Sequence, residues 1–364
     1  MGNNDFQILY KARVPWIDTA KVITMLLVVM SHCTYYRLIT PYGGIDFLYG
    51  NVEKSFVFSI LSNVTKFIYS FHMPLFMMIS GLCLALNDRN KPFVDFFFQK
   101  ARRLLIPFVL VTTFISVPCK FYGGYFSQSS NIIKDIIFGQ YLLLGNSHLW
   151  FVVSLFYIFV LFYKFKNVYK GGLYLWLILY MISILGFHLN IHYYELLGLS
   201  GFLKHFLFFS IGYYCKSLLL RKPQKSLYLI FSWCFMIFLW KSISYITYVY
   251  PSLLMEFINL SLSPVFGIWG SFNMIYTCQN IYSKINVKNT IYVYLQRHSY
   301  ELYLFSDPFN YVLIPVLYSA FGGLLVSGNL ESLCSYCLRF SLTIIFSILI
   351  ISIVKKVKIC IFHW

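Results

Sequence analysis

The chain has 364 residues, of which 59% are hydrophobic and only 11% are charged. Because soluble globular domains carry about 25% charged residues, this composition excludes a soluble protein and predicts an all-α integral membrane protein. The net charge of +17 lies in short basic clusters between apolar runs, as in cytoplasmic loops, so we expect membrane lipids as partners and no nucleic acid.

Apolar runs long enough to cross a membrane recur along the whole chain, since a spanning helix needs roughly 20 mostly apolar residues. We therefore expect a single membrane domain, residues 1–364, formed by a bundle of about ten spanning helices. The expected spans are 17–39, 64–86, 104–122, 148–164, 172–189, 199–219, 226–247, 259–280, 298–318 and 331–354. Most of the 29 Lys and Arg residues then lie on one side, which predicts that both termini are cytoplasmic.

Two long connections, 40–63 and 123–147, are expected on the outer side. Within them, segments 51–62 and 130–144 mix apolar and polar residues, which predicts short helices lying on the outer surface. We find no internal repeat, so the sequence does not indicate an inverted-repeat transporter.

The first expected span carries three side chains that lipid disfavours, Asp18, Lys21 and His32. Lys21 and His32 are eleven residues apart, so they share a helix face, and His32 lies roughly 16 Å deeper. Asp18 and Lys21 are close enough in sequence to touch at the cytoplasmic end. An ionisable residue within the membrane indicates a functional site. The alternatives are snorkelling of Asp18 and Lys21 to the interface and an interhelical hydrogen bond for His32.

Other motifs favour packing over chemistry. The nine cysteines are dispersed, which does not predict a disulfide framework, and the Cys334 and Cys337 pair is typical of apolar helix packing. The Ser80-Gly81 pair predicts close approach of two helices. The histidines at 188, 192 and 205 lack a consistent ligand spacing, so we predict no metal site.

Five blocks, taken in chain order, resemble acyltransferase family 3, the multi-spanning membrane O-acyltransferases that modify cell-surface sugars. The first is R-x-P-W-I-D-x-x-K-x(10)-H, from Arg13 to His32. The others are FHMPLFMMISG (71–81), KARRLLIP (100–107), HLWFVVSLF (148–156) and HSYELYLFSDP (298–308). The expected helix count agrees with the family. One departure is Ser306, where the family's late block often has a histidine; here Asp307 follows it.

The resemblance implies an acyl-CoA donor, such as acetyl-CoA, on the cytoplasmic side of a bacterial cell membrane. It implies an outward-facing acceptor, a capsular or other surface polysaccharide or its lipid-linked glycan precursor. Because cations bind the phosphates of CoA, we expect the donor to be bound by Lys21, Lys100, Arg102 and Arg103. At the outer mouth, His148 and Trp150 are candidates to contact the sugar, and the alternative for Trp150 is a membrane anchor.

His32 is the expected catalytic group, because an imidazole can take a proton from a sugar hydroxyl at neutral pH. It could instead accept the acyl group and pass it on, and the sequence leaves both routes open. Asp18 is placed with the catalytic candidates at the donor entrance. It is fourteen residues from His32, roughly 21 Å along the helix, so a group that orients His32 must come from another helix.

Three further residues are candidates for that orienting role: His72, Glu301 and Asp307. The alternative for His72 is helix capping or packing. The alternative for the two carboxylates is an ion pair with Arg297, Arg339 or Lys204.

Two other classes of function compete with an O-acyltransferase. One is a membrane component of polysaccharide export that transfers no acyl group, and the other is a structural scaffold. A scaffold does not explain His32 in register with Lys21. The polar residues concentrate on the first, second and ninth expected spans and on the basic loop, which favours an enzyme site over a channel.

Overall fold

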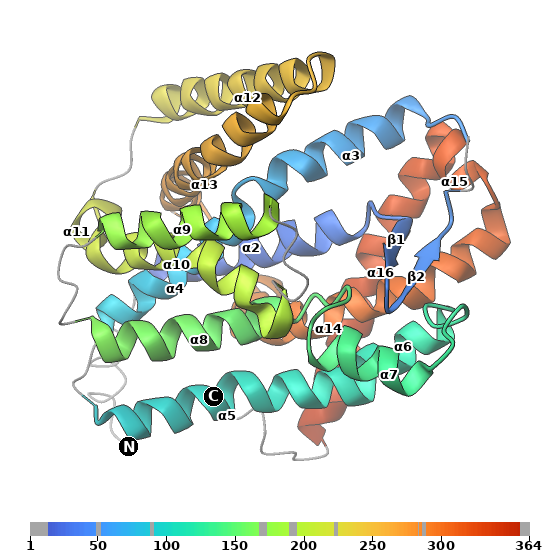
Figure 1. Ribbon diagram of the computed structural model, residues 1–364, viewed down its shortest axis with the longest axis horizontal. Coiled ribbons are helices and arrows are strands. Elements are labelled where there is room, and N and C mark those ends of the chain that lie inside the picture. The colour runs from blue at the N-terminus through green and yellow to red at the C-terminus, as the bar shows by residue number, and fades with distance from the viewer. Residues whose placement is uncertain are drawn as a thin grey trace.

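The computed structural model describes residues 14–48, 52–87, 91–166, 173–188, 195–221, 225–282, 284–285 and 289–356. Most of these residues form helices (Figure 1). Six stretches are long and apolar enough to cross a membrane: Phe56–Leu86, Phe93–Tyr122, Leu196–Tyr214, Ser226–Val249, Leu253–Tyr282 and Asn329–Lys356. The predicted helical membrane protein is thereby confirmed, while the count of ten spans and the cytoplasmic termini stay predictions.

The first half of the chain alternates long helices with a small outer substructure. Its elements are α2 (Pro15–His32), β1 (Arg37–Thr40), β2 (Gly43–Asp46), α3 (Phe56–Tyr69), α4 (His72–Leu86), α5 (Phe93–Val111), η1 (Thr112–Ser116), α6 (Val117–Tyr122), α7 (Ile132–Ile136), η2 (Ile137–Tyr141) and α8 (Trp150–Phe165).

The second half is almost entirely long helices. Its elements are α9 (Leu173–His188), η3 (Leu196–Gly198), α10 (Leu199–Tyr214), α11 (Lys216–Leu219), α12 (Ser226–Val249), α13 (Leu253–Tyr282), α14 (Thr290–Phe321), α15 (Leu324–Ser327) and α16 (Asn329–Lys356). These bounds agree with the later predicted spans to within a few residues, with two exceptions. Helix α13 begins at Leu253, before residue 259, and α14 begins at Thr290, before residue 298, and bends at His298. Residues 172 and 189 of the fifth predicted span lie outside the described residues.

The first predicted span, 17–39, is wrong at its C-terminal end. Helix α2 ends at His32, and the chain then forms an antiparallel hairpin in which Arg37 pairs with Asp46. The segment after His32 is rich in aromatic and β-branched residues, which favour strands. Gly43, at φ +117°, supplies the turn conformation that a residue with a side chain avoids.

The second predicted span, 64–86, is not one continuous helix. Helices α3 and α4 are separated at Ser70 and Phe71. Pro74 explains the break, because it has no N–H to donate to the carbonyl of Ser70 and its ring would clash there. The two segments predicted as short surface helices differ. Segment 130–144 contains the short helix α7, whereas in segment 51–62 helix α3 begins at Phe56 and continues to Tyr69.

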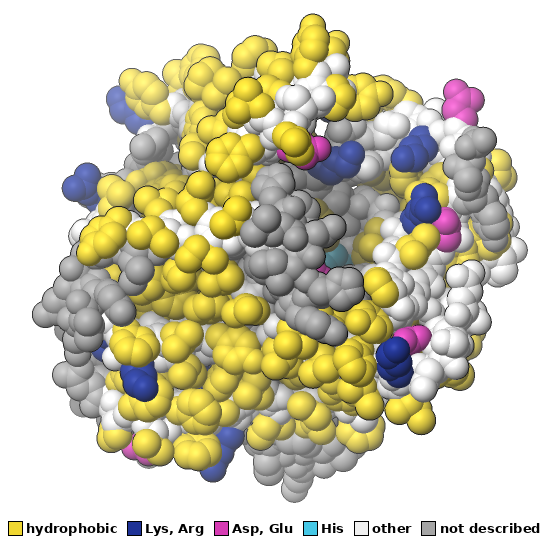
Figure 2. Space-filling model, in the orientation of Figure 1, with side chains coloured by type: hydrophobic (Ala, Val, Ile, Leu, Met, Phe, Trp, Pro, Cys, Tyr) yellow, Lys and Arg dark blue, Asp and Glu magenta, His cyan; other side chains and the backbone are white. Residues whose placement is uncertain are grey.

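Helix α2 lies in the middle of the bundle, packed against α4, α13, α14 and α16 (Figure 1). Helices α4 and α10 approach closely, because a Cβ on Gly81 would overlap the carbonyl oxygen of Phe209, and one on Gly212 would overlap that of Met78. The packing predicted for Ser80-Gly81 is confirmed. Helix α12 lies at the edge of the bundle, against α13. The face of the molecule shown in Figure 2 is largely hydrophobic with few charges, as expected of a surface in contact with lipid.

Candidate active site

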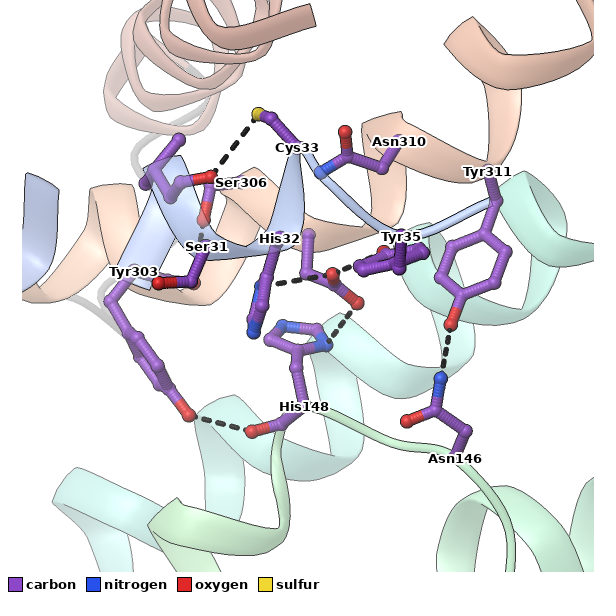
Figure 3. Close-up of polar contacts among 12 residues, drawn as sticks. Ser31, His32, Cys33, Tyr35, Asn146, His148, Tyr303, Ser306, Asn310 and Tyr311 are labelled. Carbon is purple, nitrogen blue, oxygen red and sulfur yellow. Dashed lines mark hydrogen bonds and ion pairs between the residues drawn. The ribbon is translucent and has the colours of Figure 1, made fainter. Parts of the chain in front are cut away.

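Asp307 is the centre of a buried polar cluster at the C-terminal end of α2. Figure 3 labels three members of this cluster, His32, Tyr35 and His148. One carboxylate oxygen lies 3.0 Å from Nδ1 of His32 and accepts a 2.6 Å hydrogen bond from the hydroxyl of Tyr35. The other oxygen lies 3.3 Å from Nδ1 of His148. Two imidazoles from α2 and from the residues just before α8 therefore flank one carboxylate on α14.

The surroundings of each imidazole assign its tautomer. The carboxylate favours a proton on Nδ1 of His32, so Nε2 of His32 carries the lone pair. His148 points Nε2 at the carbonyl oxygen of Leu304, 3.1 Å away, which requires a proton on that nitrogen. The hydroxyl of Tyr303 donates to the carbonyl of His148 at 2.6 Å and fixes its backbone. The free nitrogen of His32, Nε2, thus points away from the carboxylate, whereas that of His148, Nδ1, faces it; the His32 side chain also keeps 14% exposure against 2% for His148.

Arg339, on α16, holds the end of α2 in place. Its guanidinium is fully buried and donates to the carbonyl oxygens of His32 and Tyr35, each at 3.0 Å, and to Oδ1 of Asn310 at 3.1 Å. The last carbonyls of a helix lack partners within the helix, and a cation is favoured at that end. The guanidinium also lies 4.8 Å from the ring centroid of Tyr36. Arg339 fixes the turn that follows His32 and, with it, the direction of the imidazole.

Lys120, on α6, organises the loop that carries His148. Its ammonium is fully buried and donates to Oε1 of Gln140 at 2.7 Å and to the carbonyl oxygen of Asn146. It lies 4.8 Å from the ring centroids of both Tyr125 and Tyr311. Burial raises the pKa of the Tyr125 phenol, so that ring faces the cation uncharged. The amide of Asn146 donates to the Tyr311 hydroxyl at 2.8 Å, which closes the network two residues before His148.

A cavity of about 520 Å³, here named the Lys100 cavity, lies toward the other end of the same helices. The basic side chains in its lining are Lys21, Lys91, Lys100, Arg103 and Arg297, and Glu301 is the acidic one. Lys100 places its ammonium 3.5 Å from the ring centroid of Phe159. The excess of positive charge and the apolar walls suit a ligand with phosphates and a thin organic arm.

Aromatic rings separate the Lys100 cavity from the Asp307 cluster. Phe76 lines the cavity, and its ring centroid lies 4.8 Å from that of Phe151 and 6.2 Å from that of Tyr303. Tyr303 in turn bonds the carbonyl of His148. On α14, Tyr300 in the cavity lining precedes Asp307 by seven residues, roughly 10 Å along the helix.

A second cavity, of about 590 Å³, is here named the Trp150 cavity, and its lining includes Ser147, the residue before His148. It is lined by Leu38 to Pro41, by Leu143 to Ser147, by Trp150 and by residues of η3 and α10 that include Lys204 and His205. The structure separates His148 and Trp150, the two residues predicted to contact the sugar at the outer mouth. His148 is buried against Asp307, whereas Trp150 packs beside His205, with ring centroids 5.3 Å apart.

Among the remaining predicted catalytic residues, the structure brings only Asp307 to His32. Asp18 contacts Lys21 at 3.3 Å, as predicted, and accepts from Gln296 at 2.9 Å at the far end of α2. Glu301 lines the Lys100 cavity, 3.5 Å from Nδ1 of His298. His72 is buried at the start of α4, where Nδ1 lies 2.9 Å from the carbonyl oxygen of Ile68, in agreement with the packing alternative.

The four residues predicted to bind the donor do not all lie in one cavity. Lys21, Lys100 and Arg103 line the Lys100 cavity together. Arg102 is exposed and lines a separate hollow with Asp95 and Phe98, because consecutive helical residues point in different directions. The side chain of His188, and all of His192, lie outside the described residues. In the part of the chain that the structure describes, no three His, Cys, Asp or Glu side chains are grouped to hold a metal ion.

Sequence reasoning missed three residues of the site. Arg339 was not expected to support His32, Lys120 was not expected to organise the loop before α8, and Tyr35 was not expected to bond Asp307. Both cations stand inside apolar helices, and an ionisable residue in such a position is itself a signal of function. Tyr35 gave no comparable signal, since the chain has 31 tyrosines.

One protein-family model matches nearly the entire chain. A family model described as an acyltransferase domain matches residues 14–352. No curated protein and no solved structure matches the chain. The matched range contains the Asp307 cluster and both cavities.

Proposed function

Since the chain belongs to this acyltransferase family and is a multi-pass membrane acyltransferase, we propose that it moves an acyl group from cytoplasmic acyl-CoA to a sugar hydroxyl. The donor is acetyl-CoA in the first instance. The acceptor is a surface or capsular polysaccharide of a bacterial cell, or its lipid-linked precursor. The observation that carries the proposal is the Asp307 cluster at the end of α2 opposite Lys21 and the Lys100 cavity.

In this proposal the Lys100 cavity binds the donor. Lys21, Lys100 and Arg103 pair with the phosphates of CoA, and the pantetheine arm points toward Phe76. The arm carries the thioester past Phe76, Phe151 and Tyr303, whose rings must move to admit it. Only the acyl group then passes to the outer side.

His32 acts on the acceptor hydroxyl. Nε2 takes the hydroxyl proton as the sugar oxygen attacks the thioester carbonyl carbon; the carbon–sulfur bond then breaks, and the proton passes to the leaving thiolate. Asp307 holds Nδ1–H of His32 and stabilises the imidazolium that forms. In the second route, Nε2 attacks the thioester carbonyl carbon, the carbon–sulfur bond breaks and the CoA thiolate leaves. The sugar oxygen then attacks the acyl-imidazolium, the carbon–nitrogen bond breaks to restore neutral His32, and the released hydroxyl proton balances the charge of the thiolate.

The test compares membranes that contain the wild type, His32→Ala or Ser31→Ala at matched expression, supplied with radioactive acetyl-CoA. Ser31 is the matched control, because its hydroxyl bonds Leu27 on its own helix. We expect His32→Ala to lower the transfer of label to glycan by about 100-fold or more and Ser31→Ala to leave it within about twofold. Equal transfer by all three would remove His32 from the chemistry, and no transfer by the wild type would contradict an acetyl-CoA donor.

The same preparation separates the two routes. Protein is incubated with the radioactive donor, without acceptor glycan, and is then unfolded and washed. Label retained by the wild type but not by His32→Ala supports an acyl-imidazole intermediate. Absence of label on a wild type that still transfers supports direct attack.

A further inference from the structure

The Trp150 cavity has no part in donor binding, yet it adjoins the catalytic cluster. Ser147, in its lining, directly precedes His148, and Asn146 bonds Tyr311 behind the cluster. Along α8, Trp150 lies nine residues from Phe159 of the Lys100 cavity, roughly 14 Å. The two cavities therefore lie beside different turns of α8, and the residue before His148 belongs to the lining of the Trp150 cavity.

The wall of the Trp150 cavity is closely fitted. A Cβ on Gly201 would lie 2.5 Å from the Trp150 ring, so only glycine allows the indole to rest on α10. Gly198, at φ +73°, accepts a 2.7 Å hydrogen bond from Ser154 of α8 through its carbonyl. These contacts set the indole in a fixed position beside His205.

Two residues that line this space carry groups that can bind a hydroxyl, Ser147 and His205. Oγ of Ser147 is buried and has no hydrogen-bond partner among the residues that the structure describes, although the residue lines the cavity. A buried hydroxyl without a partner is costly, so a ligand that bonds it is favoured. Nδ1 of His205 donates to the carbonyl of Gly201 at 2.8 Å, which leaves the lone pair on Nε2.

The charges of this cavity nearly cancel. Lys204 and Glu195 both line it, and Glu195 acts electrostatically on Lys204. The Lys100 cavity, in contrast, has five basic side chains and one acidic side chain among the described residues of its lining. Nothing in the charge of the Trp150 cavity favours a polyanion, whereas its indole and neutral polar groups suit a sugar ring.

Resting on the function proposed above, we propose that the Trp150 cavity is the acceptor site and that it binds an uncharged sugar residue. The sugar lies against the indole of Trp150, and its hydroxyl groups bond Oγ of Ser147 and Nε2 of His205. This position directs one hydroxyl toward His32 and Asp307.

Cysteine labelling tests the site. The exposed cysteines Cys234, Cys334 and Cys337 are first replaced by serine, and Ser200→Cys is added in the cavity lining. Ser319→Cys is the matched control, because Ser319 is exposed at the outer end of α14, away from the cavity. Right-side-out vesicles are treated with a membrane-impermeant cationic methanethiosulfonate, and each variant is compared with its own untreated level.

We expect treatment of Ser200→Cys to lower transfer of label to glycan at least tenfold, while the solubilised protein retains radioactive acetyl-CoA as before. Treatment of Ser319→Cys should change neither. Labelled Ser200→Cys that transfers at its untreated rate would overturn the proposal, as would labelling of Ser200→Cys only in inverted vesicles. A wild type that transfers no label at all would instead overturn the proposed function itself.

The charge of the acceptor is read from the product. Labelled glycan is digested enzymatically to single sugars, which are separated by anion exchange. Label in the neutral fraction supports an uncharged acceptor. Label in the fraction of uronic or other acidic sugars would overturn this part of the proposal.

Discussion

The two cavities differ in how the chain builds them. The Lys100 cavity lies between helices, and its cations stand on α2, α5 and α14 or in the connection before α5. The Trp150 cavity is built largely by loops, the hairpin and the start of α10, and its charges are balanced. The comparison teaches that one chain can build a cavity rich in cations, the proposed donor site, and a cavity with balanced charges, the proposed acceptor site.

Loss of Asp307, which contacts both His32 and His148, should have the largest effect. Asp307→Asn removes the charge that holds Nδ1–H of His32, and a comparable change beside a catalytic histidine lowers kcat by up to about 10⁴-fold. We expect transfer to fall by about 1,000-fold or more, measured with radioactive acetyl-CoA.

Asp95→Asn is the matched control, because Asp95 is exposed at the start of α5. It should keep transfer within about twofold. If Asp307→Asn retained a tenth of the wild-type rate, His32 would not depend on this carboxylate.

Arg339→Met should have the next largest effect. It leaves the carbonyls of His32 and Tyr35 without their donor, and each unsatisfied buried group costs about 1–3 kcal/mol. Because Arg339 positions His32 and touches neither cavity lining, we expect kcat to fall about 10- to 100-fold while both KM values stay within about twofold.

Arg339→Lys should recover part of kcat, since an ammonium can reach a carbonyl but lacks the planar fork. Thermal unfolding in detergent measures the folded fraction of each variant. A kcat per folded molecule equal to that of the wild type would show that Arg339 serves stability alone.

Neighbouring arginines can sharpen the contrast between the cavities. Arg103→Gln should raise the donor KM about tenfold, the equivalent of about 1.4 kcal/mol, with the acceptor KM unchanged. Arg102→Gln, the adjacent control, should leave both KM values unchanged because Arg102 faces a different hollow. Equal effects of the two variants would remove the Lys100 cavity as the donor site.

Ser147→Ala should have the smallest effect, on the acceptor alone. Loss of one neutral hydrogen bond costs about 0.5–1.5 kcal/mol, so the acceptor KM should rise about 2- to 12-fold with the donor KM unchanged. Ser319→Ala is the control, since its hydroxyl bonds its own helix. A rise in the donor KM in Ser147→Ala would contradict the assignment of donor and acceptor to separate cavities.

The sequence by itself determined the helical membrane character and most helix positions, because spans are set by local apolar length. It also paired Lys21 with the His32 face and grouped Lys100 and Arg103 near it, since helical periodicity and loop charge are local properties. It did not predict that α2 ends at His32 or that α3 and α4 separate at Phe71, although Pro74 carried the signal for the second.

Only the tertiary structure decided which carboxylate meets His32. Asp307 and Glu301 were equal candidates on one predicted span, but six residues rotate the helix by about 240°, and packing of α14 against α2 turns Asp307 to His32. The same holds for Arg339, 307 residues from the carbonyl it binds. Such contacts depend on how distant helices pack, which no local pattern records, so the sequence supplied the chemical groups and the fold selected the ones that meet.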